Sequence, residues 1–258
     1  MKTMRNNTFS RRAFLGCGAL ALAALIYYLL DRLWYAAAPR SRPHWFDDSR
    51  DWQQMDKAGH AFAAYQMSRI AHRLLLWAGV APEKAHRYAA LLGFAALSPI
   101  ELLDSLATTH GASAYDLMAN AAGAALFASQ EQVAGKQFIH PKFWFAPGPY
   151  AALRTEKLGR NFAEQLIKDY NGQSYWLSLP LPFLPADYRW IRVAVGYGAT
   201  GMVYGNPDQN RRAGYQSRRH FLLGLDLELP VRLKRHKAGK IAGFLSETFR
   251  LPLPAAKW

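Results

Sequence analysis

Three apolar stretches of the sequence each carry a pair of polar residues that one helical face would bring together. The pairs are Asp56 and His60, Glu101 and Asp104, and Asp116 and Asn120. Residues three or four apart lie on the same face of a helix. An unpaired carboxylate is too costly to bury, so inward-facing pairs must meet one another, a cation or water.

Two kinds of chemistry would use such a cluster. Imidazole and carboxylate groups are ligands for a divalent metal ion, although the pattern leaves the metal and any cofactor undefined. A carboxylate and a histidine also serve as general acid and base. The candidate catalytic residues are His60, Glu101, Asp104 and Asp116. The candidate binding residues are Asp56, Lys57, Arg69 and Asn120.

A structural role accounts for the same residues. Asp56 and Asp116 fall in the first turns of predicted helices, where the helix dipole stabilises acids. Asn120 can form a hydrogen bond between helices, and Lys57 and Arg69 can pair with carboxylates. Whether the protein is an enzyme therefore stays open at the level of sequence.

Three helices are predicted to position these residues. The first runs from about Asp56 to Ala78, and the second from Pro82 to about Thr109, with Pro99 expected to kink it. The third begins at Ser113, whose spacing from Asp116 resembles a capping box, and continues to about Gln132. This three-helix body lies either at the membrane surface, which the charges within the first helix favour, or within the membrane.

A chain with a net charge of +14 is expected to bind an anionic partner, either nucleic acid or anionic lipid. The N-terminus distinguishes between the two. Basic residues precede an uncharged run from Ala13 to Leu30. About twenty apolar residues span a bilayer, and preceding basic residues keep that end in the cytoplasm. The sequence therefore predicts an inner-membrane anchor with the body in the periplasm, away from nucleic acid.

Three features refine the anchor. "SRRAFL", from Ser10, resembles a twin-arginine export signal, or is simply the positive flank of the span. Ala36 to Ala38 offer a cleavage site, but Asp31-Arg32 after a long span favours an uncleaved anchor. Cys17, the only cysteine, stands in a poor lipobox, so lipid attachment to the outer membrane is not favoured.

The remainder of the chain completes an α+β class. The predicted division is 1–38 signal or anchor, 39–55 linker, 56–135 helical domain, and 136–258 aromatic and Pro-rich segment, β-hairpin and basic tail. Trp190 to Tyr204 and His220 to Pro230 alternate with period two, as strands of an antiparallel hairpin. We expect Phe138 to Arg154 to be irregular and Glu156 to Tyr170 to be helical.

The last part of the chain is strongly basic. Residues 211–258 contain eleven Lys or Arg against three acids. Within 231–251 the basic residues are mixed with apolar ones that are spaced as one face of a helix. Such a helix binds the interface of an anionic membrane, so anionic lipid is the predicted partner, while a protein partner stays undefined.

Several of these motifs resemble a known family. They are "DKAGHAFAAYQMSR" from Asp56, Glu101-x-x-Asp104, "GASAYDLMANAAGAALF" from Gly111, "IKDYNGQSYWLS" from Ile167 and "VGYGATGM" from Val195. Together, over about residues 52–229, they resemble the YfiM-like family of uncharacterised predicted periplasmic proteins. The Asp-Lys-x-x-His and Asp-x-x-x-Asn elements are remotely similar to VanZ-like membrane proteins. Neither resemblance implies an established reaction.

The sequence thus predicts a membrane-anchored envelope protein that faces the periplasm and has a structural or interaction role at the membrane surface. The alternative is a membrane-proximal hydrolase or transferase. It would act on a lipid or cell-wall intermediate through His60 and the neighbouring carboxylates.

Overall fold

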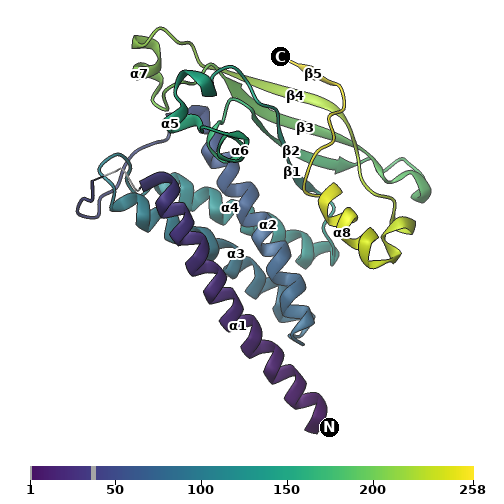
Figure 1. The fold of residues 1–258 in the computed structure, drawn as a ribbon. Helices are drawn as coiled ribbons and strands as arrows, with labels where there is room; N and C mark the ends of the chain where they lie inside the picture. The colour runs from purple at the N-terminus through teal and green to yellow at the C-terminus, as the bar shows by residue number, and fades with distance from the viewer. Residues whose placement is uncertain (1, 36–38) are drawn as a thin grey trace. The chain divides into compact units, whose positions relative to one another are not determined.

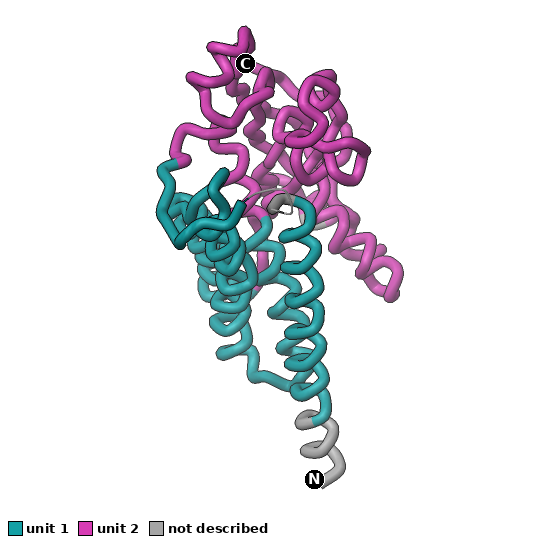
Figure 2. The backbone as a smooth tube through the Cα atoms, turned by 60° about the vertical axis from the view of Figure 1, so that its left-hand side comes forward, with its two compact units in different colours: residues 1–47, 63–135 teal, residues 48–62, 136–258 magenta. Residues whose placement is uncertain are grey.

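The computed structural model describes residues 2–35 and 39–258, and it describes their side chains except at 2–9, 34, 35 and 186. It divides the chain into two compact units (Figure 2). Residues 1–47 and 63–135 form the helical unit, and residues 48–62 and 136–258 form the sheet unit. The boundary falls inside one unbroken helix, α2, Met55–Trp77. The predicted α+β class is confirmed, while the possible cleavage site at Ala36 to Ala38 lies outside the described residues.

The long helices of the helical unit follow the predicted pattern (Figure 1). They are α1, Lys2–Leu30, with a π-helical continuation at Asp31–Tyr35, then α2, α3, Pro82–Ser105, and α4, Ala114–Ala134. Pro99 lies inside α3 without ending it. The helix ends earlier than predicted because the following residues pair elsewhere: Leu106 O accepts from Ser41 N, and Ala107 forms a bridge with Arg40.

Local signals explain how α4 begins and where the unit packs. Ser113 Oγ accepts a hydrogen bond of 3.1 Å from Asp116 N, so the predicted N-cap is confirmed. The core of the unit is a buried cluster that includes Tyr65, Ala89 and Phe127. A Cβ on Gly93 would lie 2.6 Å from Ala64 O, so glycine is needed where α3 meets α2.

Helix α1 is joined to the end of α2 by its two consecutive arginines. Arg11 Nη1 donates to Trp77 O over 3.4 Å, and its guanidinium lies 5.3 Å from the Trp77 ring centroid. Arg12 donates to Ala78 O over 3.3 Å and to Gly79 O over 3.0 Å. Carbonyls at a helix C-terminus lack partners within the helix. The arginines supply them, so α1 is bonded to the end of α2 within the helical unit.

The sheet unit contains a five-stranded antiparallel sheet in the order β1-β2-β3-β4-β5. The strands are β1, His140–Phe145; β2, Gln173–Pro180; β3, Ile191–Thr200; β4, Arg218–Leu227; and β5, Ala255–Lys257. The predicted hairpin is β3 with β4, in a register that pairs Val195 with Leu223. As predicted, the alternating apolar residues of the two strands share one face.

The prediction of an irregular segment from Phe138 to Arg154 was wrong, because β1 forms within it. Pro141 suggested a break, but β1 is an edge strand, where a residue without an N–H is tolerated. The strand pairs with β2, which the sequence reading had not identified. The hairpin is therefore the centre of a larger sheet.

Two predicted helices are interrupted. Glu156 to Tyr170 is divided into α5, Thr155–Leu158, and α6, Phe162–Lys168, because Gly159 adopts a φ of 105°. The basic stretch forms a 3₁₀ turn, Val231–Arg235, and then α8, Lys237–Ser246, with extended backbone at His236 between them. The loop between β3 and β4 contains α7, Pro207–Arg212, and short 3₁₀ turns occur at Asp51–Gln54, Ala151–Leu153 and Ala186–Tyr188.

Candidate functional site

Two buried carboxylates meet around the start of α4. Glu101, near the end of α3, is 4 % exposed, and its Oε2 accepts a 2.8 Å hydrogen bond from Ser113 N. Asp116, in the first turn of α4, is 6 % exposed, and its backbone N donates to Ser113 Oγ. The N-cap serine is therefore bonded to both acidic residues, through Glu101's carboxylate and Asp116's backbone. This arrangement fixes where α3 and α4 present their acids.

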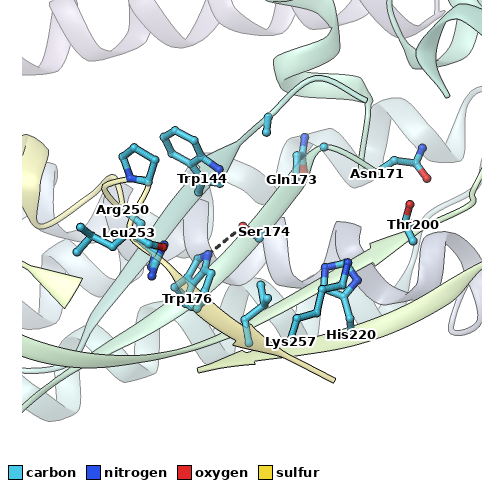
Figure 3. Close-up of a pocket in the computed structure, with 15 residues that line it drawn as sticks. Trp144, Asn171, Gln173, Ser174, Trp176, Thr200, His220, Arg250, Leu253 and Lys257 are labelled. Carbon is cyan, nitrogen blue, oxygen red and sulfur yellow. Dashed lines mark hydrogen bonds between the residues drawn. The ribbon is translucent and has the colours of Figure 1, made fainter. Parts of the chain in front are cut away.

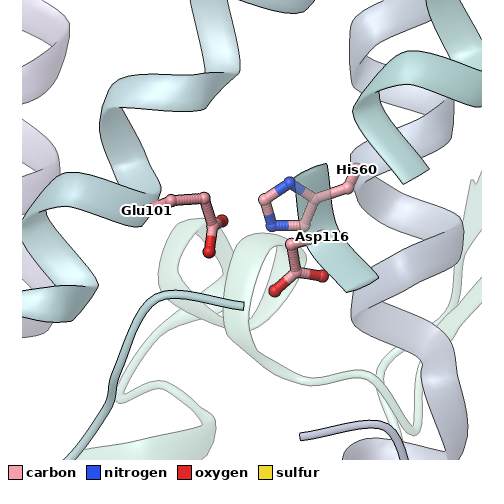
Figure 4. A group of neighbouring side chains, drawn as sticks. All are labelled: His60, Glu101 and Asp116. Atoms are coloured by element: carbon pink, nitrogen blue, oxygen red, sulfur yellow. The ribbon is translucent and has the colours of Figure 1, made fainter. Parts of the chain in front are cut away.

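His60 belongs to the same group. One ligand atom from each of His60, Glu101 and Asp116 lies within 4.8 Å of the others (Figure 4). The three residues come from α2, α3 and α4 in turn. One imidazole nitrogen and two carboxylate oxygens form a donor set that suits a divalent cation such as Zn²⁺ or Mn²⁺. The same groups suit general acid–base chemistry.

The remaining predicted site residues have different surroundings. Asp104 is half-buried and is not part of that group, whereas Asn120 is fully buried. Lys57 forms ion pairs with Asp48 and, over 2.9 Å, with Asp56. One ammonium group is thus shared by two carboxylates at the start of α2.

Arg69 is the charge buried deepest along α2, at 4 % exposure. Its Nη1 donates to Gln66 Oε1 over 2.8 Å, and its guanidinium lies 5.9 Å from the Tyr65 ring centroid. A buried cation needs such partners. Arg69 is thus accommodated by neighbours on its own helix.

The sheet unit holds a second cluster that the sequence analysis missed. Glu228 contacts His140 Nδ1 at 2.5 Å and Arg192 Nε at 2.9 Å, and Lys142 Nζ lies 3.7 Å away. The lysine also pairs with Asp226 at 2.5 Å. We call these five residues, with Ser178, the ion network.

Ser178 links the two halves of the ion network. Its hydroxyl donates to Asp226 Oδ2 over 2.6 Å and accepts from Arg192 Nε over 2.8 Å. The side chains of Lys142 and Asp226 are fully buried. Polar residues alternate with apolar ones along β4, and only the pairing of four strands shows that the polar residues of different strands face one another. Because the network is sealed, its role is structural.

Burial and charge act in opposite directions on the pKa values in this network. Burial raises the pKa of Glu228, but the hydrogen bond from His140 and the nearby charges of His140, Arg192 and Lys142 outweigh it and lower the pKa to about 2. Burial lowers the pKa of Lys142, and the charges of Asp226 and Glu228 offset only part of that effect.

Comparison with known proteins supports a coarse family resemblance. Residues 43–130 match the model of a family described as predicted periplasmic lipoprotein (DUF2279). No curated protein and no solved structure matches the chain. The match is shorter than the 52–229 suggested by the motifs, and it supports neither the YfiM-like name nor the VanZ-like similarity. A twin-arginine signal is likewise unsupported.

The match includes all four candidate catalytic residues and ends before the sheet. Together with the apolar N-terminal helix, the family description fits a membrane-anchored protein of the periplasm. Cys17, on which a lipid anchor would depend, lies outside the matched residues.

Thermal unfolding with an added divalent cation tests whether His60, Glu101 and Asp116 bind a metal ion. If His60, Glu101 and Asp116 bind Zn²⁺ or Mn²⁺, an excess of about one hundred times Kd stabilises the full chain by about 2.7 kcal/mol, or several degrees in Tm. Glu101→Gln and Asp116→Asn should remove most of this shift in thermal unfolding. Asp104→Asn, which lies outside the group, is the matched control and should keep it. An equal shift in Glu101→Gln would contradict the proposed ligands.

The ion network gives a stability prediction. Glu228→Gln leaves His140, Lys142 and Arg192 with one carboxylate fewer, so unfolding free energy should fall by about 3–5 kcal/mol in denaturant titrations. The exposed Glu156→Gln is the control and should change it little. Because the folded-state pKa of Glu228 is lowered, its contribution is present above pH 4.5 and is lost as pH falls toward 2. An unchanged acid profile in Glu228→Gln would refute this account.

Proposed function

We propose that this chain is an inner-membrane protein whose helical unit lies in the bilayer and whose sheet unit faces the periplasm. Its role is to hold an envelope partner or surface in place, without catalysis. The observation that carries the proposal is the bonding of Arg11 and Arg12 to the last carbonyls around the end of α2.

The first step concerns which helices share the bilayer with α1. Two described helices, Ser10–Leu33 and Pro82–Ser105, are long and apolar enough to cross a membrane by length and composition. The N-terminal part of α1 bonds the C-terminal end of α2, and Tyr27 OH donates to Ala96 O of α3 over 2.5 Å. A bilayer that contains α1 therefore also contains the parts of α2 and α3 bonded to it.

The surface of these helices supports the same location. Large apolar side chains are exposed on α1, on the second half of α2 and on α3. They include Leu20, Leu22, Leu25, Leu29, Ile70, Leu74, Leu76, Leu91, Leu92 and Leu102. A belt of this extent is unusual on a soluble unit and suits contact with lipid. Of the two locations left open by the sequence, we favour embedding over a bundle at the surface.

Charge orients the embedded helices. The end of the unit that carries Arg11 and Arg12 also carries Arg73, Lys84 and Arg87, against the acid Glu83. Such an excess of cations marks the cytoplasmic side. Helix α2 begins in the sheet unit and ends at this cytoplasmic side, so the chain that precedes α2 faces the periplasm. This orientation agrees with the description of the matched family.

The sheet unit has a surface suited to anionic lipid. Within the basic segment, residues 231–251, Val231, Leu233, Ile241 and Leu245 are exposed. So are the cations Arg232, Arg235, Lys237 and Lys240. Lys234 Nζ donates to Glu247 Oε1 over 2.5 Å and so ties the 3₁₀ turn to the end of α8. Apolar side chains flanked by cations favour the lipid interface.

A second candidate function is favoured by the group of His60, Glu101 and Asp116. These residues fit a membrane-proximal hydrolase or transferase that acts on a lipid or cell-wall intermediate. A bound cation would polarise the reacting oxygen or activate water. The cation titration described above bears on this alternative, because the metal-assisted form of the reaction requires an ion held by these residues.

Cysteine accessibility tests the topology. In a Cys17→Ser background, Ala81→Cys in the turn between α2 and α3 should react with an impermeant maleimide only after the membrane is opened. Ala213→Cys, after α7 in the sheet unit, should react in intact spheroplasts. Labelling of Ala81→Cys from outside would show that α2 does not cross. A phosphatase fused after Trp258 should be active, since the chain end lies in the periplasm.

Fluorescence tests the lipid contact. A polarity-sensitive dye on Ile241→Cys, in the Cys17→Ser background, should shift to the blue when the full chain is reconstituted into anionic vesicles. Salt should reverse the shift, and a dye on Ala213→Cys should not respond. Each cation near the surface contributes about 1 kcal/mol, so Lys237→Gln with Lys240→Gln should weaken the response strongly. Equal shifts in neutral and anionic vesicles would defeat the assignment.

A further inference from the structure

A pocket of 390 Å³ lies on the face of the sheet that carries Ser174 and Trp176 (Figure 3). Strands β1 to β4 and the segment from Arg250 to Lys257 surround it, so it belongs wholly to the sheet unit. Its volume is within the range of small-ligand sites. No part of the proposed function uses it.

Three glycines shape this face. A Cβ on Gly196 would lie 2.6 Å from the Trp176 ring, and one on Gly198 would lie 2.5 Å from His220 Nε2. A Cβ on Gly224 would lie 2.8 Å from Pro254 O. Any side chain at these positions would displace the groups that line the pocket. The glycines of "VGYGATGM" thus create space for an aromatic ring and an imidazole.

The lining of the pocket is cationic and aromatic. His220, Arg250 and Lys257 line it, and none of the described lining residues is acidic. Trp144 and Trp176 supply ring surface. Hydroxyl and amide groups complete the lining, from Asn171, Gln173, Ser174 and Thr200.

Arg250 is a built part of this site. It is 4 % exposed, and its guanidinium carbon lies 3.9 Å from the Trp176 ring centroid. Its Nη atoms donate to Leu225 O, Leu251 O and Leu253 O. Its Nε and His220 Nδ1 are buried without a hydrogen-bond partner among the described residues. Positive charge is therefore fixed beneath the pocket: no lining residue supplies a carboxylate, and the buried Asp226 acts on Arg250 from outside the lining.

We propose that this pocket binds a sugar ring that carries a carboxylate or a phosphate. The cations attract the anionic group, and Lys257 reaches it from the exposed rim. The indole rings cover the apolar side of the sugar. The amides and hydroxyls exchange hydrogen bonds with its hydroxyl groups.

Protonation of His220 is coupled to this binding. Burial, followed by the charge of Lys257, lowers the pKa of His220 below its ordinary value. A bound anion opposes both effects and favours the imidazolium. Binding therefore takes up a proton, so the affinity rises as pH falls from 7 toward 5.5.

Titration of the full chain in detergent tests the proposal through tryptophan fluorescence. The probes are N-acetylmuramic acid, N-acetylglucosamine 6-phosphate, neutral N-acetylglucosamine and inorganic phosphate. At least one acidic sugar should bind ten times more tightly than the neutral sugar and than inorganic phosphate. Which acidic sugar binds distinguishes a carboxylate from a phosphate. Equal affinity for the neutral sugar, or for phosphate alone, overturns the proposal.

Variants locate the site. Lys257→Met should lower the affinity for the acidic sugar about tenfold, and His220→Gln should remove the rise in that affinity at low pH. Lys237→Met, a cation of the basic segment outside the pocket, is the matched control and should bind as the parent does. Unfolding curves check that each variant is folded. Full affinity in both Lys257→Met and His220→Gln would overturn the assignment. Sugar binding in detergent does not depend on the membrane topology of the chain. A failure to bind sugar would therefore leave the proposed function untouched, and a failure of the proposed topology would leave sugar binding untouched.

Discussion

The donation of hydrogen bonds from Arg11 and Arg12 to the carbonyls at and just beyond the end of α2 constrains the rest of the helical unit. Guanidinium groups satisfy helix-terminal acceptors that would otherwise be left without partners. They also bring two cations to the turn before α3. Within the helical unit, these bonds join α1 to the turn between α2 and α3. On the proposed function, a bilayer that contains α1 would therefore also hold the parts of α2 and α3 that are bonded to it.

The same physics of charge burial explains the sheet unit. In the ion network, Asp226 and Glu228 meet Lys142, Arg192 and His140, so each buried charge has a partner of opposite sign. Farther along the same face of the sheet, Arg250 is buried against Trp176 and carbonyl oxygens, without a carboxylate in the pocket lining. One end of the face is therefore neutralised by ion pairs, whereas at the other end Arg250 is influenced by the charge of Asp226 without an ion pair, and the proposed ligand would add a negative charge there. The ion network and the pocket thus each contain some of the basic residues that give the chain its net charge of +14.

Sequence patterns predicted the elements whose signals are local. Pro82 and Ser113 mark the starts of α3 and α4, and alternation reveals β3 and β4. The edge strand β1 was missed because Pro141 resembles a break, although a proline is harmless where no neighbour needs its N–H. Periodicity placed Glu101 and Asp104 on one helical face, but only packing shows that Glu101 bonds Ser113 N while Asp104 is half-buried. The ion network depends on strand register across β1 to β4, which no local pattern determines.

The part of the chain that matches the predicted periplasmic family contains α2, α3 and α4 with their polar group, and it excludes the sheet. On the proposed topology, His60 lies near the periplasmic start of α2, and Glu101 lies near the periplasmic end of α3. Asp116 begins α4 directly after the turn that follows. On that proposal the three residues would stand near the depth of the lipid headgroups, with Glu101 and Asp116 buried among the helices. Ionisable residues in membrane helices are costly and commonly functional. The group of His60, Glu101 and Asp116 therefore lies in the part of the chain that the family match covers, whereas the proposed sugar pocket lies outside it.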